Sequence, residues 1–432
     1  MATIVPFRGL RYNPEKICDL SQVVTPPYDV IDDIAQARYY AQHPANVIRL
    51  ELGLTYPQDT ASNNRYSRAN QYLEKWLEEE VLIPDPQPSL YIYEQEFAVK
   101  GKRMIRTGLV TGLKVEPYES GVVLPHEETL SKPKADRLQL MRATRSNFSS
   151  IFGLYFDPQQ EVVHLLRQEI NDQPPAIDII DEVGEAHRVW VIDNKKVIDR
   201  VVELFRDKQI YIADGHHRYE TALEYAQEMK EQGQPGYDYV LTTLVNVYDP
   251  GLLVLPTHRL VGNLSDFNAR SFQDRLADLF TLEKFGSLDD LPQLMAKLEE
   301  QRERHVFGMA MDEQLYFLVL KDWEKAAALL PSERSSSWKA LDVAILDNLI
   351  LDNILGIGEA QRRSQDNLTY SRDEEWVVDQ IRNRNYQLGF LLNPTQVQEI
   401  IDVAQARDKM PQKSTYFYPK LITGLIINKL DI

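Results

Sequence analysis

The spacing of apolar residues along the chain predicts several amphipathic helices. In each of them apolar side chains recur every three to four positions, so they would lie on one face of the helix and pack against a core. The helix that begins near Arg218 would end near Gly233, a residue type suited to a helix C-terminus. These helices are expected at residues 67–82, 195–207, 218–233 and 393–404.

Strand patterns lie between these helices. Continuous or alternating apolar runs bounded by turn residues predict strands, and two such runs joined by a short polar turn predict a hairpin. Single strands are expected at residues 46–53, 188–194 and 210–214. Hairpins are expected where KGK joins 90–99 to 103–115, where DE joins 305–311 to 314–320, and where Pro250 and Gly251 join 239–249 to 252–261.

Together these elements predict an α+β protein with a mixed sheet. At 432 residues the chain exceeds the usual size of a single hydrophobic core, so two or three packed subdomains are expected. The pattern shifts toward helices from about residue 263. This shift divides the chain into an α+β region at residues 1–262 and a more helical region at residues 263–432. The run PSERSSSW at residues 331–338 is expected to be a linker or an exposed loop.

The balance of charge argues against nucleic acid as a partner. There are 48 basic and 65 acidic residues, and the net charge of -17 repels polyanions over most of the surface. No helix-turn-helix or basic tail is recognisable. No apolar run approaches the roughly 18 to 20 residues that span a bilayer, and the first residues lack a secretory signal, so we expect a cytoplasmic protein. The single cysteine, Cys18, excludes an internal disulfide and a zinc cluster built from cysteines.

The segment IYIADGHHRYETAL places Asp214, Gly215, His216, His217 and Arg218 between a predicted strand and a predicted helix. A strand-to-helix turn exposes backbone N–H groups and the positive end of the helix dipole, which together favour an anion. The glycine lets the backbone approach a ligand closely, while the arginine and a histidine can add charge-assisted hydrogen bonds to phosphate oxygens. The aspartate could hold Mg²⁺ against the same phosphates. The turn is therefore a candidate phosphate site.

Two other interpretations of this turn remain open. In one of them an aspartate or a histidine caps the helix, Arg218 lies on the surface, and the second histidine is merely packed. In the other the two histidines bind zinc, but adjacent histidines point to different faces and no cysteine or nearby histidine completes a ligand set.

A basic segment upstream supplies a second group of candidates. LPHEETLSKPKADRLQLMRATR contains two adjacent carboxylates and several basic side chains, although the chain as a whole is acidic. Phosphoryl transfer needs positioned positive charge and a carboxylate that accepts the proton of the attacking hydroxyl. Glu127 is therefore a candidate base, and Arg137 and Arg142 are candidate phosphate ligands. The alternative is an exposed loop followed by a solvated helix face, as most charge runs are.

Two further segments carry candidates. In TPPYDV the prolines stiffen a turn that holds Asp29, which is either a second candidate base or metal ligand, or the cap of the following helix. KSTYFYPK could close over a nucleotide, with lysines on phosphate and an aromatic ring against the base, or it could form a core strand. Pro419 argues against a central strand. The candidates are Lys413, Ser414, Thr415 and Lys420, and Thr257, His258 and Arg259 are candidates to line the same site.

Several segments also resemble a known family. Over nearly its full length the chain is similar to a bacterial and archaeal domain-of-unknown-function family, numbered one thousand and fifteen. ADGHHRYETAL resembles the signature of the ParB/sulfiredoxin-like superfamily and of the free serine kinases within it. The residues that carry the resemblance are PFRGLRYNP at 6–14, TPPYDVI at 25–31, LPHEETL at 124–130, ADGHHRYETA at 213–222, LPTHRL at 255–260 and MPQKSTYFYPK at 410–420.

The resemblance implies a ParB/sulfiredoxin-like core that carries a nucleotide site. In the related serine kinases the Asp-Gly-His-His-Arg turn binds nucleotide phosphates, which implies that Gly215, His216 and Arg218 hold phosphate while Asp214 and His217 take part in catalysis. An upstream glutamate acts there as the base on the serine hydroxyl. LPHEETL is similar to that upstream segment, which implies Glu127, although the interval to the turn contains an extra strand and helix.

The implied reaction is the transfer of phosphate from ATP or ADP, with Mg²⁺, to the hydroxyl of a free amino acid, with L-serine as the first choice of acceptor. One alternative is a regulator that binds nucleotide without turnover. Another is a ParB-like nuclease or DNA-binding protein, which the acidic charge disfavours. A homodimer is compatible with the sequence.

Overall fold

The chain folds into two compact units. The computed structural model describes residues 1–432 apart from 130, 172, 235 and 432. Unit 1 contains Met1–Pro125, Thr129–Leu253 and Pro419–Ile432, and unit 2 contains His126–Glu128 and Val254–Tyr418. Each unit therefore combines segments that are far apart in the sequence. The division into an α+β region and a more helical region, expected at residue 262, stays a prediction.

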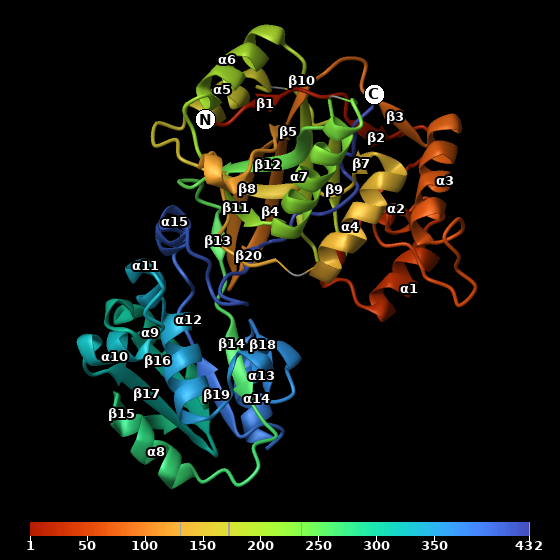
Figure 1. Ribbon diagram of the computed structural model, residues 1–432. Coiled ribbons are helices and arrows are strands. Elements are labelled where there is room, and N and C mark those ends of the chain that lie inside the picture. The colour runs from red at the N-terminus through yellow and green to blue at the C-terminus, as the bar shows by residue number, and fades with distance from the viewer. Residues whose placement is uncertain (130, 172, 235, 432) are drawn as a thin grey trace. The chain divides into compact units, whose positions relative to one another are not determined.

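Unit 1 is built on a nine-stranded mixed sheet (Figure 1). Strand β11 pairs in parallel with β6 and β12 with β8, while the remaining neighbours are antiparallel. The hairpin predicted around KGK is confirmed by the pairing of β4 with β5. The order is β6-β11-β8-β12-β5-β4-β10-β9, with β1 also on β5. The strands are β1 (Ile4–Val5), β4 (Leu90–Val99), β5 (Lys102–Lys114), β6 (Val123–Leu124), β8 (Ile151–Tyr155), β9 (Ile177–Ile180), β10 (Ala186–Ile192), β11 (Ile210–Asp214) and β12 (Tyr239–Asn246).

Helices α4 to α7 complete the core of this sheet. The apolar faces predicted from the sequence are buried, as Val201 and Phe205 of α6 and Tyr219 of α7 show. Helix α4 lies beside α7, so the basic segment that forms α4 runs next to the helix that starts at the candidate turn (Figure 1). The four helices are α4 (Ser131–Thr144), α5 (Glu161–Glu169), α6 (Lys195–Phe205) and α7 (His216–Glu231).

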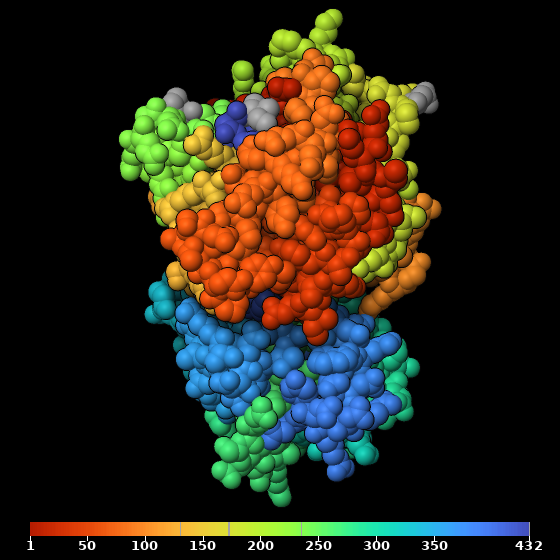
Figure 2. Space-filling view, turned by 90° about the vertical axis from the view of Figure 1, so that its right-hand side faces the viewer, coloured from red at the N-terminus to blue at the C-terminus, as the bar shows by residue number. Residues whose placement is uncertain are grey.

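The N-terminal part of unit 1 forms a second core around helix α3. Leu73 and Trp76 of α3 pack there with Tyr12 and with Ile427 near the other end of the chain. This N-terminal segment, coloured red to orange, makes up much of the visible surface of unit 1 (Figure 2). The helix predicted at residues 67–82 is confirmed, although it ends at Glu78 and Leu82 belongs to strand β3. The elements are α1 (Asp33–Gln42), α2 (Ile48–Glu51), α3 (Arg65–Glu78), β2 (Leu10–Tyr12) and β3 (Leu82–Pro84).

The strand predicted at residues 46–53 is wrong, because this segment forms the single helical turn α2. The side-chain oxygen of Asn46 accepts the N–H of Ile48 at 2.9 Å, a local bond that favours a turn over an extended chain. Ile48, Leu50 and Glu51 are all buried, so their spacing does not separate a core face from a solvent face.

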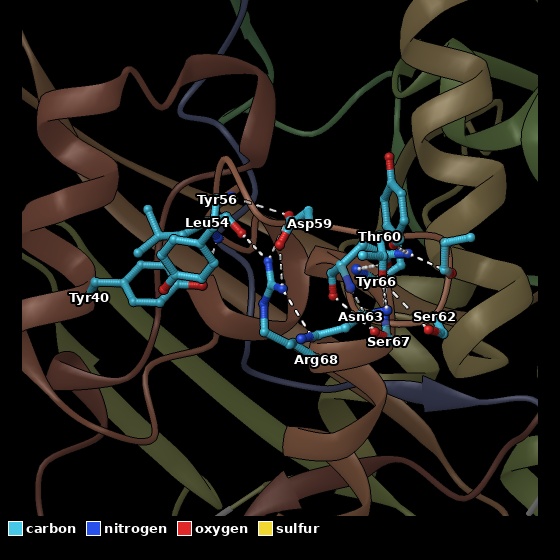
Figure 3. A network of polar contacts seen from close by, with 12 residues as sticks. Tyr40, Leu54, Tyr56, Asp59, Thr60, Ser62, Asn63, Tyr66, Ser67 and Arg68 are labelled. Carbon is cyan, nitrogen blue, oxygen red and sulfur yellow. Dashed lines mark hydrogen bonds and ion pairs between the residues drawn. The ribbon is translucent and has the colours of Figure 1, made fainter.

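The loop that leads into α3 is held by a network of polar contacts (Figure 3). Arg68 donates to the carbonyl of Leu54 at 2.8 Å and forms an ion pair with Asp59 at 2.7 Å. The side chain of Asn64 accepts the N–H of Ser67 at 3.1 Å, and the hydroxyl of Ser67 accepts the N–H of Asn64 at 3.0 Å. This reciprocal capping box fixes the residue at which α3 begins.

Replacing Asn64 with alanine is expected to lower the free energy of unfolding by about 1 kcal/mol, because α3 loses the acceptor at its N-terminus. Urea unfolding followed by circular dichroism measures the change. Ser62→Ala is the matched control, since within the described chain the Ser62 hydroxyl makes one long contact, 3.5 Å from that of Thr60. Equal losses in the two variants would contradict the capping role of Asn64.

Unit 2 is built on a six-stranded antiparallel sheet in the order β15-β17-β16-β19-β14-β18. The hairpin predicted across DE is confirmed as β16 and β17. Leu294 of α9 and Val377 of α14 pack in the core of this sheet. The strands are β14 (His258–Val261), β15 (Phe280–Ser287), β16 (Val306–Met311), β17 (Gln314–Leu320), β18 (Leu368–Ser371) and β19 (Leu388–Leu391).

The hairpin predicted across Pro250 and Gly251 is wrong. Strand β12 pairs with β5 and β8, whereas β14 pairs with β18 and β19, so the two runs belong to different sheets. Two adjacent apolar runs with a turn between them do not show which partners each run takes. The remaining strands are β7 (Ser146–Asn147), β13 (Leu253–Val254), β20 (Phe417–Tyr418) and β21 (Asn428–Lys429).

The segment predicted as a linker at residues 331–338 contains the start of helix α11, whose Trp338 is buried. The π-helix η6 (Leu346–Ile354) follows α12 and is wider than an ordinary helix. Among the described helices, none combines the length and apolar character that crossing a membrane requires. The helices of unit 2 are α8 (Ala269–Ala277), α9 (Leu291–Glu300), α10 (Trp323–Leu329), α11 (Ser336–Lys339), α12 (Asp342–Ile345), α13 (Glu359–Ser364), α14 (Glu374–Arg382) and α15 (Val397–Gln405).

Candidate functional site

The candidate turn joins strand β11 to helix α7 within unit 1. Gly215 is the N-cap of α7 and has a φ of +93°, in the left-handed region that favours glycine. A Cβ on this residue would lie 3.0 Å from Nε of Arg218. Glycine is therefore favoured both by the backbone and by the packed arginine. The interpretation in which Asp214 or a histidine caps α7 is wrong, because the N-cap is a glycine without a side-chain bond.

Asp214 holds two positively charged side chains at this turn. Its Oδ1 accepts a hydrogen bond from Nζ of Lys420 at 2.6 Å, and its Oδ2 accepts one from Nη2 of Arg218 at 2.7 Å. Burial alone would raise the pKa of Asp214, but Lys420 and Arg218 lower that pKa well below its ordinary value. Asp214 therefore stays ionised at neutral pH and fixes the positions of both cations.

Arg218 is buried and anchored at two points. The residue is 9% exposed, and its Nη1 donates to the main-chain carbonyl of Ser150 at 2.6 Å while Nη2 donates to Asp214. Because the guanidinium group is planar, these two bonds fix its orientation as well as its position. The interpretation that placed Arg218 on the surface is wrong.

The two histidines of the turn lie in different environments. His216 is buried and His217 is half-buried. Burial lowers the pKa of His217, and the carboxylates of Glu220 and Asp29 only partly oppose that effect. The lowered pKa favours the neutral form of His217 at pH 7.

Asp29 lies in the same electrostatic environment as the turn. It is exposed, and its charge acts on both Arg218 and His217. The alternative that Asp29 caps the following helix is wrong, because Asp32 is the N-cap of α1 and accepts the N–H of Ala35 at 2.8 Å. Unit 1 thus brings a carboxylate from TPPYDV near the candidate phosphate site.

Arg137 of α4 is buried in a cluster of charges. Its Nη1 lies 3.3 Å from Oε1 of Glu51, and its Nε donates to Asp136 at 2.8 Å. Its guanidinium carbon lies 4.1 Å from the centre of the Tyr28 ring. Arg137 therefore does not belong to a solvated helix face. Arg137 and Arg218 line the same cavity of about 30 Å³, which has room for about one or two water molecules.

Arg142 lies farther along the same pair of helices. Its Nε donates to Oε2 of Glu228 at 3.0 Å. Glu228 follows His216 by three turns of α7, a distance of about 18 Å along the helix axis. The structure therefore does not bring Arg142 to the candidate turn.

Glu127 belongs to unit 2, whereas Asp214 belongs to unit 1. The backbone of Glu127 forms a parallel bridge with Met410, so LPHEETL runs beside the start of MPQKSTYFYPK. The structure thus groups two of the segments that the sequence singled out. The pairing of Glu127 with the turn stays a prediction.

Lys413, Ser414 and Thr415 also belong to unit 2. The main-chain carbonyl of Lys413 accepts a hydrogen bond from Arg259 at 3.4 Å. Ser414 is buried, and its hydroxyl donates to the main-chain carbonyl three residues earlier at 2.5 Å. The hydroxyl of Thr415 lies 3.1 Å from Nε2 of His126. These three residues therefore help to hold unit 2 together, and their predicted part in binding nucleotide stays a prediction.

The residues of the turn do not fit a magnesium ion. Mg²⁺ prefers carboxylate oxygens and phosphates, but Lys420 and Arg218 engage both oxygens of Asp214 and add positive charge. The described residues that are grouped closely enough to hold a metal are Asp181, Glu185 and His187. The two histidines of the turn are not among them. The charge of the turn fits an anion.

Two residues that contact the arginines of this site, Glu51 and Ser150, were not among the candidates predicted from the sequence. Glu51 is fully buried beside Arg137, and a glutamate inside the apolar run NVIRLELG is a signal that could have indicated it. Ser150 acts through its main-chain carbonyl. Any residue type provides that carbonyl, so the sequence contains no signal for Ser150.

The chain was compared with solved structures and with curated proteins. A free serine kinase mutant in complex with ADP is 11% identical, with 71% of this chain and 90% of that chain covered and a TM-score of 0.34. A conserved hypothetical protein from Pyrococcus furiosus is 10% identical, with 72% and 94% covered and a TM-score of 0.33. C-terminally truncated SbnI from Staphylococcus aureus is 9% identical, with 73% and 87% covered and a TM-score of 0.34. The curated proteins gave no match.

A family model gives the more specific result. The model described as "Protein of unknown function (DUF1015)" matches residues 4–344, which is most of the chain. This match confirms the family resemblance, and five of the six segments that carry the resemblance lie within the matched residues, whereas MPQKSTYFYPK at 410–420 lies beyond them. The chain belongs to the DUF1015 family.

Proposed function

We propose that unit 1 binds the phosphates of ATP or ADP at the turn from Asp214 to Arg218, and that the protein transfers phosphate to the hydroxyl of a small molecule. Free L-serine is the first candidate acceptor. The observation that carries the proposal is the pair of cations, Arg218 and Lys420, that Asp214 holds beside the N-terminus of α7.

Three independent features of the turn favour a phosphate. The first N–H groups of α7 have no partner within the helix, and the aligned peptide dipoles make this end positive. Arg218 and Lys420 are held in place before any ligand arrives, so little reorganisation is needed on binding. The glycine N-cap leaves the backbone open to close approach. These features concentrate positive charge in a chain whose net charge is -17.

The proposed reaction needs positioning more than covalent chemistry. The bond between the terminal phosphorus and its bridging oxygen breaks, and a bond forms from the acceptor hydroxyl oxygen to that phosphorus. The hydroxyl proton passes to a carboxylate, and ADP or AMP leaves. Asp29 and Glu127 are the two candidate bases. Asp29 shares unit 1 with the turn and acts electrostatically on Arg218 and His217, which supports it.

Further parts of the proposed function concern the fold of unit 1 and the residues that hold the nucleotide. The core of unit 1 would be ParB/sulfiredoxin-like, and nucleotide would be held by Gly215, His216 and Arg218. His217, whose pKa is lowered by burial, would take part in catalysis near the transferred group, while the proton passes to the carboxylate. Magnesium, if the reaction uses it, would enter with the nucleotide rather than on Asp214.

The proposal is tested by incubating the full-length protein with ATP or ADP, with and without Mg²⁺, and a panel of free amino acids and other small hydroxyl compounds. Mass spectrometry follows the phosphorylated product. We expect O-phosphoserine. Asp29→Asn and Glu127→Gln are assayed in parallel, and the variant of the true base is expected to lose about 10²- to 10⁴-fold in turnover with nucleotide affinity retained.

The outcomes separate the alternatives. Unchanged turnover in one of these two variants removes that residue from the mechanism. Nucleotide binding without product from any acceptor contradicts the kinase and supports a regulator that binds nucleotide without turnover. Failure to bind either nucleotide contradicts the proposal as a whole.

A further inference from the structure

Unit 2 contains a cavity of about 180 Å³ that is lined entirely by its own residues. The residues that matter for its chemistry include Trp338, Asp347, Tyr370, Arg363 and Glu128. Sites for drug-sized ligands usually measure about 300 to 1,000 Å³. This cavity therefore suits a molecule smaller than a nucleotide.

The most deeply buried polar residue of the lining is Asp347, which is 2% exposed. Its nearest cation is Arg259, with Nε 3.5 Å from Oδ1, too long for a good hydrogen bond. Within the described part of the chain, Oδ1 has no hydrogen-bond partner. Burial raises the pKa of Asp347, which Arg259 and Arg362 only partly oppose. A donor with positive charge would therefore stabilise this carboxylate.

Trp338, in the same lining, offers a hydrogen-bond donor, whereas Asp347 offers an acceptor. It is 4% exposed, and its indole N–H has no hydrogen-bond partner among the residues that the structure describes. Buried indole N–H groups usually find an acceptor. The guanidinium carbon of Arg334 lies 5.1 Å from the centre of the Trp338 ring, so an acceptor there would also meet positive charge.

The charges of the lining disfavour ligands whose charges are all of the same sign. Three arginines, at positions 334, 362 and 363, disfavour a free cation, while four carboxylates disfavour a polyanion such as a nucleotide. At the more exposed part, Arg363 pairs with Glu359 at 2.5 Å and lies 3.9 Å from Glu128. A ligand with both a positive and a negative group is compatible with this mixed surface.

Two further observations single out this cavity. Asp347 lies in the π-helix η6, and π-helical segments are rare and are frequently found at functional sites. The cavity also gathers residues from segments that the sequence singled out, with Glu128 from LPHEETL and Met410 and Gln412 from MPQKSTYFYPK. Arg259, which belongs to LPTHRL, lies beside Asp347, with its Nε 3.5 Å from Oδ1.

We propose that this cavity of unit 2 binds a small zwitterion of the amino-acid class, with its ammonium group at Asp347 and its carboxylate at Trp338 and the neighbouring arginines. The site goes beyond the proposed function, since its residues belong to unit 2, whereas the proposed phosphate residues belong to unit 1, and it does not depend on phosphoryl transfer.

Isothermal titration of the full-length protein tests this proposal without nucleotide. The probes are glycine, L-serine, L-valine and L-glutamate as zwitterions, acetate and methylammonium as single charges, and inorganic phosphate. We expect at least one zwitterion to bind at least tenfold more tightly than acetate or methylammonium. Asp347→Asn and Trp338→Phe are expected to weaken that binding at least tenfold and severalfold, respectively.

Two controls keep the result interpretable. Arg363→Ala changes an exposed side chain of the lining, is expected to fold, and should weaken binding severalfold even if Asp347→Asn does not fold. Arg218→Lys, in unit 1, should leave binding unchanged. Binding that is lost in Arg218→Lys but intact in the unit 2 variants would overturn the proposal and place the amino acid at the phosphate turn. Tighter binding of phosphate than of any zwitterion, or no binding by any probe, would overturn it as well.

Discussion

Replacing Arg218 with alanine is expected to weaken nucleotide binding roughly 100-fold. Each hydrogen bond to a charged group contributes about 1.5 to 3 kcal/mol, and a planar guanidinium group can offer two such bonds to a phosphate. In the free protein Ser150 and Asp214 already fix this group, so its loss removes charge that is positioned in advance. Equilibrium titration with ADP and ATP measures the effect.

The variant should also be less stable, but by less than the roughly 3 to 5 kcal/mol expected when a buried charge loses its sole partner. Lys420 still pairs with Asp214 after the substitution, which limits the cost. Arg218→Lys keeps the charge without the planar fork and should recover part of the affinity. Arg200→Ala removes an exposed arginine of α6 and is the matched control for net charge. Equal nucleotide affinity in Arg218→Ala and Arg200→Ala would contradict a phosphate site at the turn.

Replacing Arg137 with alanine is expected to destabilise the protein by about 3 kcal/mol or more at neutral pH. Glu51 is 2% exposed, and Arg137 is the cation that most strongly offsets its burial. Without Arg137 the carboxylate of Glu51 would stay buried and lose most of the positive charge that stabilises it. An unpaired buried charge is among the costliest single changes in a core. Urea unfolding at several pH values measures the loss.

The pH dependence of this variant has a definite sign. Burial already raises the pKa of Glu51, and loss of Arg137 should raise it further. The folded state then binds more protons than the unfolded state, so stability should fall as pH rises from about 4.5 through the raised pKa. Arg137→Ala combined with Glu51→Gln removes the charge and should recover much of the loss. If the double variant is no more stable than the single one at pH 7, the buried charge is not the cause.

Local patterns predicted the elements of this protein better than they predicted its pairings. Helices α3, α6 and α7 follow from apolar spacing because each has one buried face, and the β4–β5 hairpin follows because its turn is short and polar. The run from 252 to 261 was misassigned because strand partners are chosen by the whole fold. Residues 46–53 were misassigned because the hydrogen bond from the N–H of Ile48 to the side chain of Asn46 favours a turn over an extended chain.

In the candidate site, too, local features could be predicted better than contacts between distant residues. The turn from Asp214 to Arg218 could be predicted because its residue types and its position between a strand and a helix act locally. That Lys420 rather than a metal would meet Asp214 depends on contacts across the chain, and so does the burial of Arg137 against Glu51. Residue types alone contain no information about which charges share a core.

The C-terminal segment of unit 1 bears on how the protein is made. Lys420 and strand β21, which pairs with β7, are synthesised only after Val254–Tyr418. At roughly 5 to 20 residues per second the ribosome needs about 10 to 30 s for that stretch. During this interval a nascent unit 1 has Asp214 and Arg218 but lacks the second cation. A growing chain should therefore become able to bind phosphate with both cations only after Lys420 has been added.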